Sequence, residues 1–268
     1  MRGAQARKLS LPRPPNTMAE LFINTAIRAA KEAGALLREN YGKELAVDEM
    51  LDHDIKLALD VKSQELITRI LLAEHPEHAL FGEEGIDENQ DSPYQWVVDP
   101  IDGTVNYFYS IPHFCVSIAL RHEGKIILGV IYDPMLDELF QAEVGKGAFR
   151  NGEPMKVSQR ELKNSVITIG FSKDAASIDA GLVRYQEIAY KVRKTRVFGS
   201  AALALAYIAC GRLDAYIEEQ ISLWDIAAGW LMIEEAGGVI EIRDSPVKKD
   251  KMAVIASNGV VNLSSVKR

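Results

Sequence analysis

The apolar run Trp96-Val97-Val98 leads directly into Asp99-Pro100-Ile101-Asp102-Gly103-Thr104, and this junction constrains the fold more than any other segment. Three consecutive large apolar residues predict a buried strand that ends at Asp99, where Pro100 stiffens the exit. Gly103 and Thr104 then predict a tight turn and a helix N-terminus whose backbone N–H groups suit an anion. Two carboxylates beside an anion site indicate a cation between them. The alternative is a plain Asp-Pro and Asp-Gly turn.

Two further acidic positions suit the same site. Gly82-Glu83-Glu84 follows the short apolar run 79–81, and Asp225 precedes a helical pattern. Magnesium prefers hard oxygen ligands and usually takes a few carboxylates together with phosphate oxygens of a substrate. Taken alone, each acid has another explanation, because loop acids are often solvated and Asp225 is expected to be a helix N-cap.

Size and composition exclude several classes of protein. The 268 residues fit one large domain or two small ones, and 47% hydrophobic with 26% charged residues is ordinary for a soluble globular chain. The net charge of −7 argues against a nucleic-acid-binding protein. No apolar run approaches the ~18 residues of a membrane span. Cys115 and Cys210 lie in apolar stretches, which favours free thiols in a reducing compartment over a disulfide.

The first 17 residues differ from the rest of the chain. They contain four basic residues, three prolines and no acid, without the apolar core of a secretory signal. We predict a disordered N-terminal extension over 1–17, in a cytoplasmic protein whose helical pattern opens at Met18. An organelle transit peptide is the alternative for this segment.

The remaining pattern indicates one domain over 18–268, with halves that meet near residues 145 and 146. Apolar spacing predicts helices over 21–41, 61–75, 181–193, 200–210 and 226–235. Strands are predicted at 96–99, 114–121, 125–132, 139–142, 166–169, 196–198, 213–217, 238–242 and 253–256. Because strands and helices alternate in blocks, we expect a layered mixed α/β fold rather than a doubly wound sheet.

Together, these motifs resemble the inositol monophosphatase family, within the lithium-sensitive sugar-phosphatase superfamily. The motifs are Gly82-Glu83-Glu84, the run from Trp96 to Thr104, Trp224-Asp225-Ile226-Ala227-Ala228-Gly229, and Glu235-Ala236-Gly237-Gly238. The resemblance extends over about residues 20–260. It implies an α+β, layered αβαβα sandwich of the inositol monophosphatase and fructose-1,6-bisphosphatase type, and a homodimer.

The resemblance also implies a ligand set for two magnesium ions. The ligands of the first ion would be Glu83, Asp99 and the carbonyl of Ile101. Those of the second would be Asp99, Asp102 and Asp225. Four clustered carboxylates would repel one another unless cations neutralised them, so the physical argument agrees with the resemblance.

Other residues match the phosphate-binding and water-orienting positions of the family. Gly103 and Thr104 match the amides that cradle the phosphate, and Thr104 with Glu83 would orient the attacking water. Asp60 matches the acid that supports the threonine. The segment from Asp54 to Asp60 departs from the family, because Lys56-Leu57 replaces the usual Val-Thr pair. Glu49 stands where a basic residue is common, so a third magnesium site is left open.

On the substrate side, the resemblance implies that Gly199, Ser200 and Ala201 lie near the sugar and that Glu218 accepts hydrogen bonds from substrate hydroxyls. The alternative for Glu218 is a solvated acid at a strand end. The implied activity is magnesium-dependent hydrolysis of a small polyol phosphate, with myo-inositol 1-phosphate as the default. Fructose-1,6-bisphosphate, histidinol phosphate and adenosine 3′,5′-bisphosphate stay open. A regulatory protein that binds other macromolecules also stays open, although a non-catalytic descendant of the phosphatase family would be expected to lose a metal ligand.

Overall fold

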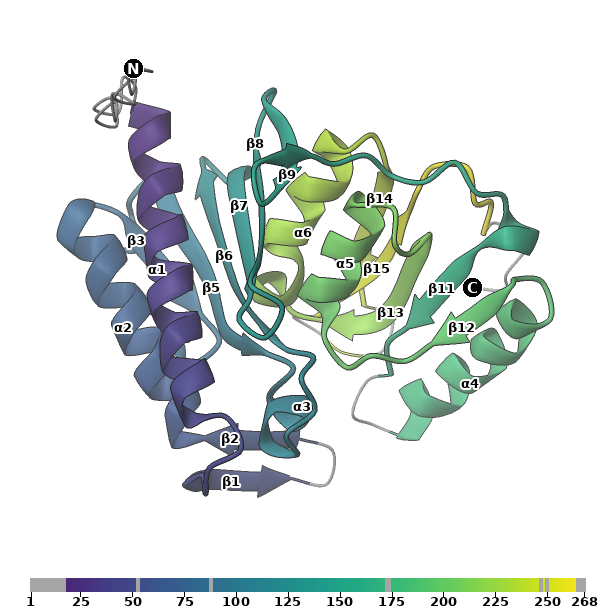
Figure 1. Cartoon of the computed structure of the whole chain (residues 1–268), viewed down its shortest axis with the longest axis horizontal. Coiled ribbons are helices and arrows are strands. Elements are labelled where there is room, and N and C mark those ends of the chain that lie inside the picture. The colour runs from purple at the N-terminus through teal and green to yellow at the C-terminus, as the bar shows by residue number, and fades with distance from the viewer. Residues whose placement is uncertain are drawn as a thin grey trace, which may run out of the picture.

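The computed structural model describes residues 18–51, 54–86, 89–171, 175–245, 248 and 251–263. Within this part of the chain, helices and sheets alternate in five layers (Figure 1). The expected αβαβα sandwich is thereby confirmed. The predicted extension over 1–17 lies outside the described residues. Among the described helices, none has the length and apolar character that a membrane crossing requires.

The first layer is a pair of helices, α1 (Met18–Asn40) and α2 (Ala58–Glu74), which cover one face of the first sheet (Figure 1). Ala26, Ala30 and Ala33 of α1 are completely buried, and their spacing places them on one stripe of the helix. A two-stranded hairpin of β1 (Val47–Leu51) and β2 (Asp54–Leu57), which was not predicted, precedes α2. Leu57 therefore leads directly into α2, and this helix begins three residues before the predicted position.

The second layer is an eight-stranded sheet of order β10-β9-β8-β7-β6-β5-β3-β4. Its strands are β3 (Ala79–Gly82), β4 (Gly85–Ile86), β5 (Tyr94–Asp102), β6 (Cys115–His122), β7 (Lys125–Asp133), β8 (Glu138–Glu143), β9 (Gly147–Arg150) and β10 (Glu153–Pro154). Only β3 and β5 pair in parallel among its neighbours. The predicted hairpin between β6 and β7 is confirmed, with positive φ at Glu123 and Gly124.

Strand β5 does not end at Asp99 as predicted but continues through Pro100 to Asp102. Its pairing with β6 shifts register between Asp99 and Asp102. Such an irregularity frees the position of Pro100 from the hydrogen-bonded ladder, which a proline nitrogen cannot join as a donor. The strand therefore carries both aspartates to the edge of the sheet before the short helix α3 (Thr104–Phe108) begins.

The central layer consists of α5 (Ala201–Ala209) and α6 (Leu223–Glu235), which lie between the two sheets (Figure 1). Helix α6 packs so closely on β7 that a Cβ atom at Gly129 would lie 2.7 Å from the carbonyl oxygen of Ala228. The N-cap of α6 is Ser222, so the expectation that Asp225 caps this helix is wrong. Asp225 instead occupies the third helical position and accepts a 2.8 Å hydrogen bond from the backbone N–H of Ser222.

The last two layers are a five-stranded sheet of order β12-β11-β13-β15-β14 and the helix α4 (Ala175–Ala189). Its strands are β11 (Val166–Ile169), β12 (Lys194–Arg196), β13 (Ala215–Ile221), β14 (Val239–Asp244) and β15 (Met252–Ser257), and a 3-10 turn (Leu162–Asn164) precedes them. The predicted bounds of two elements are wrong. The helix predicted over 181–193 begins and ends later in the sequence than α4, and the strand predicted over 196–198 begins and ends later than β12. Gly181 lies inside α4, where a Cβ atom would meet the Phe171 ring at 2.9 Å, so this glycine serves close packing rather than helix initiation.

Candidate active site

Three carboxylates from two layers of the fold converge at one point. Asp99 and Asp102 stand at the end of β5, and Asp225 stands in the first turn of α6. One carboxylate oxygen from each lies within 4.8 Å of the others. Asp99 and Asp102 are buried, with exposed fractions of 1% and 6%. Residues far apart in the sequence thus form a compact set of hard oxygen donors, the kind that magnesium prefers.

The electrostatics of this cluster favour a bound cation. Burial raises the pKa of Asp99 well above its ordinary value, and the neighbouring charges of Glu83, Asp102, Asp225 and Asp60 raise it further. Burial also raises the pKa of Asp102, although hydrogen bonds to its carboxylate oppose the shift. A divalent cation would stabilise the charged forms that the protein alone disfavours.

Asp102 is held by the N-terminus of α5, across the boundary between two layers. It accepts hydrogen bonds from the Ser200 hydroxyl, from the backbone N–H of Ala201 at 3.2 Å and from that of Ala202 at 2.8 Å. Ser200 also caps α5, because its Oγ accepts from the Leu203 N–H. The residues that the sequence placed on the substrate side therefore contact a candidate metal ligand.

The threonine after the turn contacts the acid that was expected to support it. The Thr104 hydroxyl lies 2.9 Å from the carbonyl oxygen of Ile101 and 3.4 Å from Oδ1 of Asp60. Because the hydroxyl has one proton, it donates to one of these acceptors at a time. Asp60 is buried and also accepts a 2.8 Å bond from the Leu57 N–H. Its position is thus set by the start of α2 rather than by Thr104.

A glycine is required at the turn between β5 and α3. Gly103 has φ +98, and a Cβ atom there would lie 3.1 Å from the carbonyl oxygen of His113. Either constraint alone disfavours a larger residue. Gly103 and Thr104 are half-buried and line the same cavity as the carboxylates.

The cavity at this point has a volume of about 360 Å³. Among the residues predicted for the site, those that line it are Glu83, Asp99, Ile101, Asp102, Gly103, Thr104, Gly199, Ser200, Ala201, Glu218 and Asp225. Asp60 lies behind Thr104 and does not line the cavity. The structure therefore brings the predicted site residues together around one opening between the two sheets.

Glu83 and Glu218 reach the cavity from opposite sheets. Glu83 follows β3, and its backbone N–H donates to the carbonyl oxygen of Val98 at 3.1 Å, which aligns it with β5. Glu218 lies within β13 rather than at a strand end, and it accepts a hydrogen bond from the buried Tyr216 hydroxyl. A Cβ atom at Gly170 would overlap the Glu218 carboxylate, so this glycine leaves the space that Glu218 occupies.

Sequence reasoning missed Asn106, Tyr216 and Lys251, which also line the cavity. Asn106 Nδ2 donates at 2.8 Å to the carbonyl oxygens of both His113 and Phe198, and so connects the two halves of the chain. The spacing of Tyr216 two residues before Glu218 places both side chains on one face of a strand, a signal that could have identified it. No local signal marks Asn106 or Lys251.

The segment that departs from the family pattern forms an ion pair. Lys56 Nζ lies 3.8 Å from a carboxylate oxygen of Glu84, and the lysine side chain is 44% exposed. Asp54 and Glu49 belong to the β1–β2 hairpin, but their side chains lie outside the described residues.

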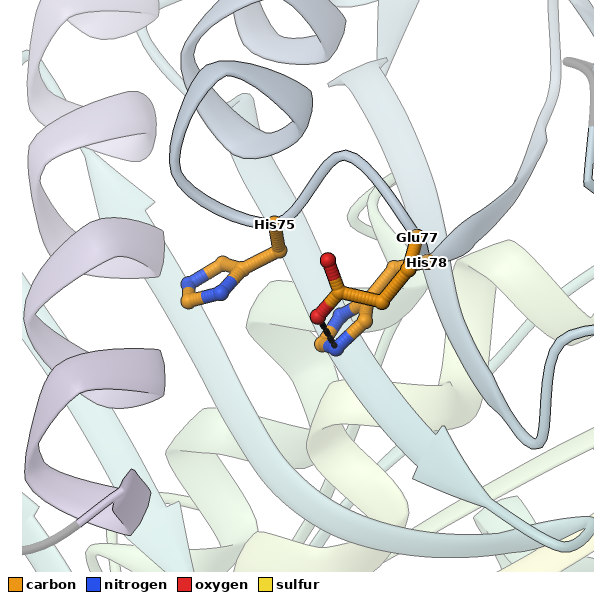
Figure 2. A group of neighbouring side chains, drawn as sticks. All are labelled: His75, Glu77 and His78. Atoms are coloured by element: carbon orange, nitrogen blue, oxygen red, sulfur yellow. Dashed lines mark ion pairs between the residues drawn. The ribbon is translucent and has the colours of Figure 1, made fainter.

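A second group of possible metal ligands, His75, Glu77 and His78, lies just after α2 (Figure 2). None of the three lines the cavity described above. The two imidazole rings stack at 4.9 Å with an interplanar angle of 16°. Imidazole nitrogens coordinate in the ring plane, so nearly parallel rings do not direct their lone pairs at one ion. His78 Nε2 faces the Glu77 carboxylate at 3.5 Å, and His75 Nε2 lies 3.4 Å from the Thr25 hydroxyl. We interpret this group as an aromatic packing unit.

Comparison with known proteins decides the family. The model of the inositol monophosphatase family matches residues 18–265. The chain belongs to this family. It is 40% identical over 234 residues to inositol monophosphatase 3 of Solanum lycopersicum, covering 84% of this chain and 87% of the relative. It is 39% identical over 224 residues to the Nus factor SuhB of Pasteurella multocida, covering 82% and 84%.

A solved structure supports the same assignment. The inositol monophosphatase of Anabaena (Nostoc) sp. PCC 7120 superposes with a TM-score of 0.79 at 38% identity, covering 91% of this chain and 93% of that chain. As a member of the inositol monophosphatase family, this protein is a phosphatase. The family is metal-dependent. The cluster of Asp99, Asp102 and Asp225 is a donor set that fits this dependence.

Proposed function

We propose that the protein is a magnesium-dependent phosphomonoesterase that hydrolyses a small polyol phosphate, with myo-inositol 1-phosphate as the principal candidate. The observation that carries this proposal is the convergence of three carboxylates within 4.8 Å of one another in the lining of a cavity of about 360 Å³. A cavity of this size accommodates a six-carbon polyol and its phosphate.

In this proposal, magnesium is bound by Glu83, Asp99, the carbonyl of Ile101, Asp102 and Asp225, as two ions. When bound, the ions supply Lewis-acid stabilisation of phosphate oxygens and lower the pKa of a coordinated water. The donor set fits because all five groups offer oxygens. It also fits because burial, and then repulsion from neighbouring carboxylates, raise the pKa of Asp99, and a cation would offset both effects.

The residues of the turn would orient the reactants. The backbone N–H groups of Gly103 and Thr104 would bind phosphate oxygens, and Gly103 leaves them accessible because it lacks a side chain. The Thr104 hydroxyl would orient the attacking water, with its proton directed toward Asp60 Oδ1, 3.4 Å away. Glu83 would accept a proton from the same water.

The opposite wall would recognise the alcohol. The Glu218 carboxylate would accept hydrogen bonds from substrate hydroxyls, with Tyr216 holding its orientation. Gly199, Ser200 and Ala201 would shape the floor of the pocket beside Asp102.

A test of this function is phosphate release from a panel of sugar, polyol and nucleotide phosphates, with and without magnesium. The panel includes myo-inositol 1-phosphate, histidinol phosphate, fructose 1,6-bisphosphate and adenosine 3′,5′-bisphosphate. We expect myo-inositol 1-phosphate to be hydrolysed fastest and lithium to inhibit. Asp99→Asn should lower the rate of phosphate release at least ~100-fold. Altering a residue that merely supports a metal ligand usually lowers activity up to about 100-fold, and removing a ligand itself should lower it more. Asp91→Asn, at an exposed position, is the matched control.

A regulatory role is a second candidate, because relatives named Nus factor SuhB match this chain at 37% to 39% identity. A regulatory binding protein with residual phosphatase activity would release phosphate from every member of the panel slowly and without a preferred substrate. We also propose a homodimeric, cytoplasmic protein. Light scattering would test the dimer, and truncation of residues 1–17 without a change in thermal midpoint or turnover would support a dispensable extension.

A further inference from the structure

Lys251 is the one basic side chain among the described residues that line the cavity. The same lining contains five acidic side chains, from Glu83, Asp99, Asp102, Glu218 and Asp225. A cation in such a pocket contributes strongly to which anions can enter it, because charges in a concave, partly desolvated site are poorly screened. The proposed phosphatase chemistry gives Lys251 no role.

The register of the second sheet places Lys251 at the cavity. Ile221 of β13 pairs with Met252 of the antiparallel strand β15. The residue after Ile221, Ser222, therefore lies near the residue before Met252, Lys251, and the Lys251 ammonium donates to the Ser222 hydroxyl. The register shift between Glu218 and Ile221 lies directly beside this pair. Bulges of this kind redirect side chains at a strand edge, and here Glu218 and Lys251 both line the cavity.

The ammonium group is anchored but not neutralised. Lys251 Nζ donates to the Ser222 hydroxyl and lies 5.3 Å from the centroid of the Trp224 ring. Within the described part of the chain it forms no ion pair with a carboxylate. An ammonium has three donors, and Ser222 takes only one of them.

We infer that Lys251 forms a subsite for a second anionic group on the substrate, a further phosphate or a carboxylate, beside the phosphate that is hydrolysed. This inference rests on the proposed function of the cavity. It predicts that phosphorylated sugars with a second anionic group are better substrates than matched esters without one. The Ser222 hydroxyl and the Trp224 ring hold the lysine in place, so little ordering is required when an anion binds.

The test uses matched substrate pairs and two variants. Fructose 1,6-bisphosphate and fructose 1-phosphate differ by one phosphate, whereas 2-phosphoglycerate and glycerol 2-phosphate differ by one carboxylate. Lys251→Met keeps an unbranched apolar stem against Trp224 without the charge, and Lys251→Arg keeps the charge. We expect Lys251→Met to lower kcat/KM about 10- to 100-fold for the member of one pair that carries the second anionic group, the range for a lost charge-assisted hydrogen bond. Its partner should change less than about threefold, and Lys251→Arg should restore most of the difference. The pair that responds identifies the second group as phosphate or carboxylate.

Equal losses on both members of each pair would overturn the inference, because Lys251 would then support the reacting phosphate or the fold. Unchanged rates on all four esters would overturn it as well. Acylation of Lys251, followed by peptide mass spectrometry, is the readout independent of turnover. Fructose 1,6-bisphosphate should slow acylation of Lys251 several-fold more than fructose 1-phosphate does, and equal protection would contradict the subsite. If the parent protein releases phosphate from none of the esters, the proposed function fails, and this protection measurement alone decides the subsite.

Discussion

The carboxylate of Asp102 accepts a 2.8 Å hydrogen bond from the backbone N–H of Ala202, although the first residue ends β5 and the second begins α5. Asp99, three residues earlier on the same strand, accepts one described hydrogen bond, from the Ile101 N–H at 3.0 Å. The two aspartates are both buried in one candidate metal site, but the protein directs several hydrogen-bond donors at Asp102 and one described donor at Asp99.

This difference predicts opposite effects on stability in the absence of metal. Asp99→Asn should raise the free energy of unfolding in EDTA, because it removes repulsion from Glu83, Asp102 and Asp225 while the amide oxygen still accepts from Ile101. Asp102→Asn should lower it by about 1–3 kcal/mol, because one amide oxygen cannot serve all the donors that face the carboxylate. Urea denaturation with EDTA measures both. Equal shifts in the same direction would show that the support from α5 is unimportant.

A second prediction concerns Glu218 and the polyol. Glu218→Gln should lower kcat/KM for myo-inositol 1-phosphate by a factor that corresponds to ~1–3 kcal/mol of activation free energy. This is the cost of losing a charge-assisted hydrogen bond. Turnover of p-nitrophenyl phosphate should change much less, because its leaving group has no hydroxyl to recognise. Equal losses on both substrates would assign Glu218 to folding or metal support, and no loss on either would leave it without a role in recognition.

Gly170 provides a steric test of the same carboxylate. A Cβ atom at this position would overlap Glu218 and lie 2.9 Å from the Tyr216 hydroxyl, whereas the backbone there has no left-handed φ. Gly170→Ala should therefore displace Glu218 and reproduce the substrate selectivity of Glu218→Gln, with p-nitrophenyl phosphate again spared. A Gly170→Ala enzyme with parental kcat/KM on both esters would mean that the Glu218 carboxylate does not need its observed position.

The stacked histidines predict a pH dependence of stability. Burial lowers the pKa of His78 to about 4, and His75 adds to the shift, while burial also lowers the pKa of His75. At low pH the unfolded chain binds protons on these histidines that the folded chain excludes. Their contribution to the free energy of unfolding is therefore fully present above about pH 6.5 and is lost as the pH falls toward 4. The loss attributable to His78 is at most about 3 kcal/mol.

His78→Phe keeps a ring between His75 and Tyr94 and removes the titrating group. Its free energy of unfolding should vary less with pH between 6.5 and 4 than that of the parent. Trp96→Phe, a buried aromatic that contacts the same rings, is the control and should lower stability without changing the slope. Parallel pH profiles for His78→Phe and the parent would refute the assignment.

The sequence alone determined the fold family and indicated most of the residues that line the candidate site. Periodic apolar residues predicted α1 and the hairpin of β6 and β7, because burial of one helical stripe or of successive strand residues depends on local spacing. The acids were recognisable as candidate ligands because hard cations such as magnesium take their ligands from a few residue types. Errors arose where tertiary packing overrides local signals, as at Gly181, which looked like a helix boundary and lies inside α4.

Only the tertiary structure decided which groups meet across layers. The sequence placed Ser200 and Ala201 near a sugar, but it could not show that α5 points its N-terminus at Asp102. It could not show that Ile221 pairs with Met252 and thereby brings Lys251 to the cavity. The physical reason is that side-chain chemistry is encoded locally, whereas strand register and the docking of helices between sheets depend on the packing of the whole core.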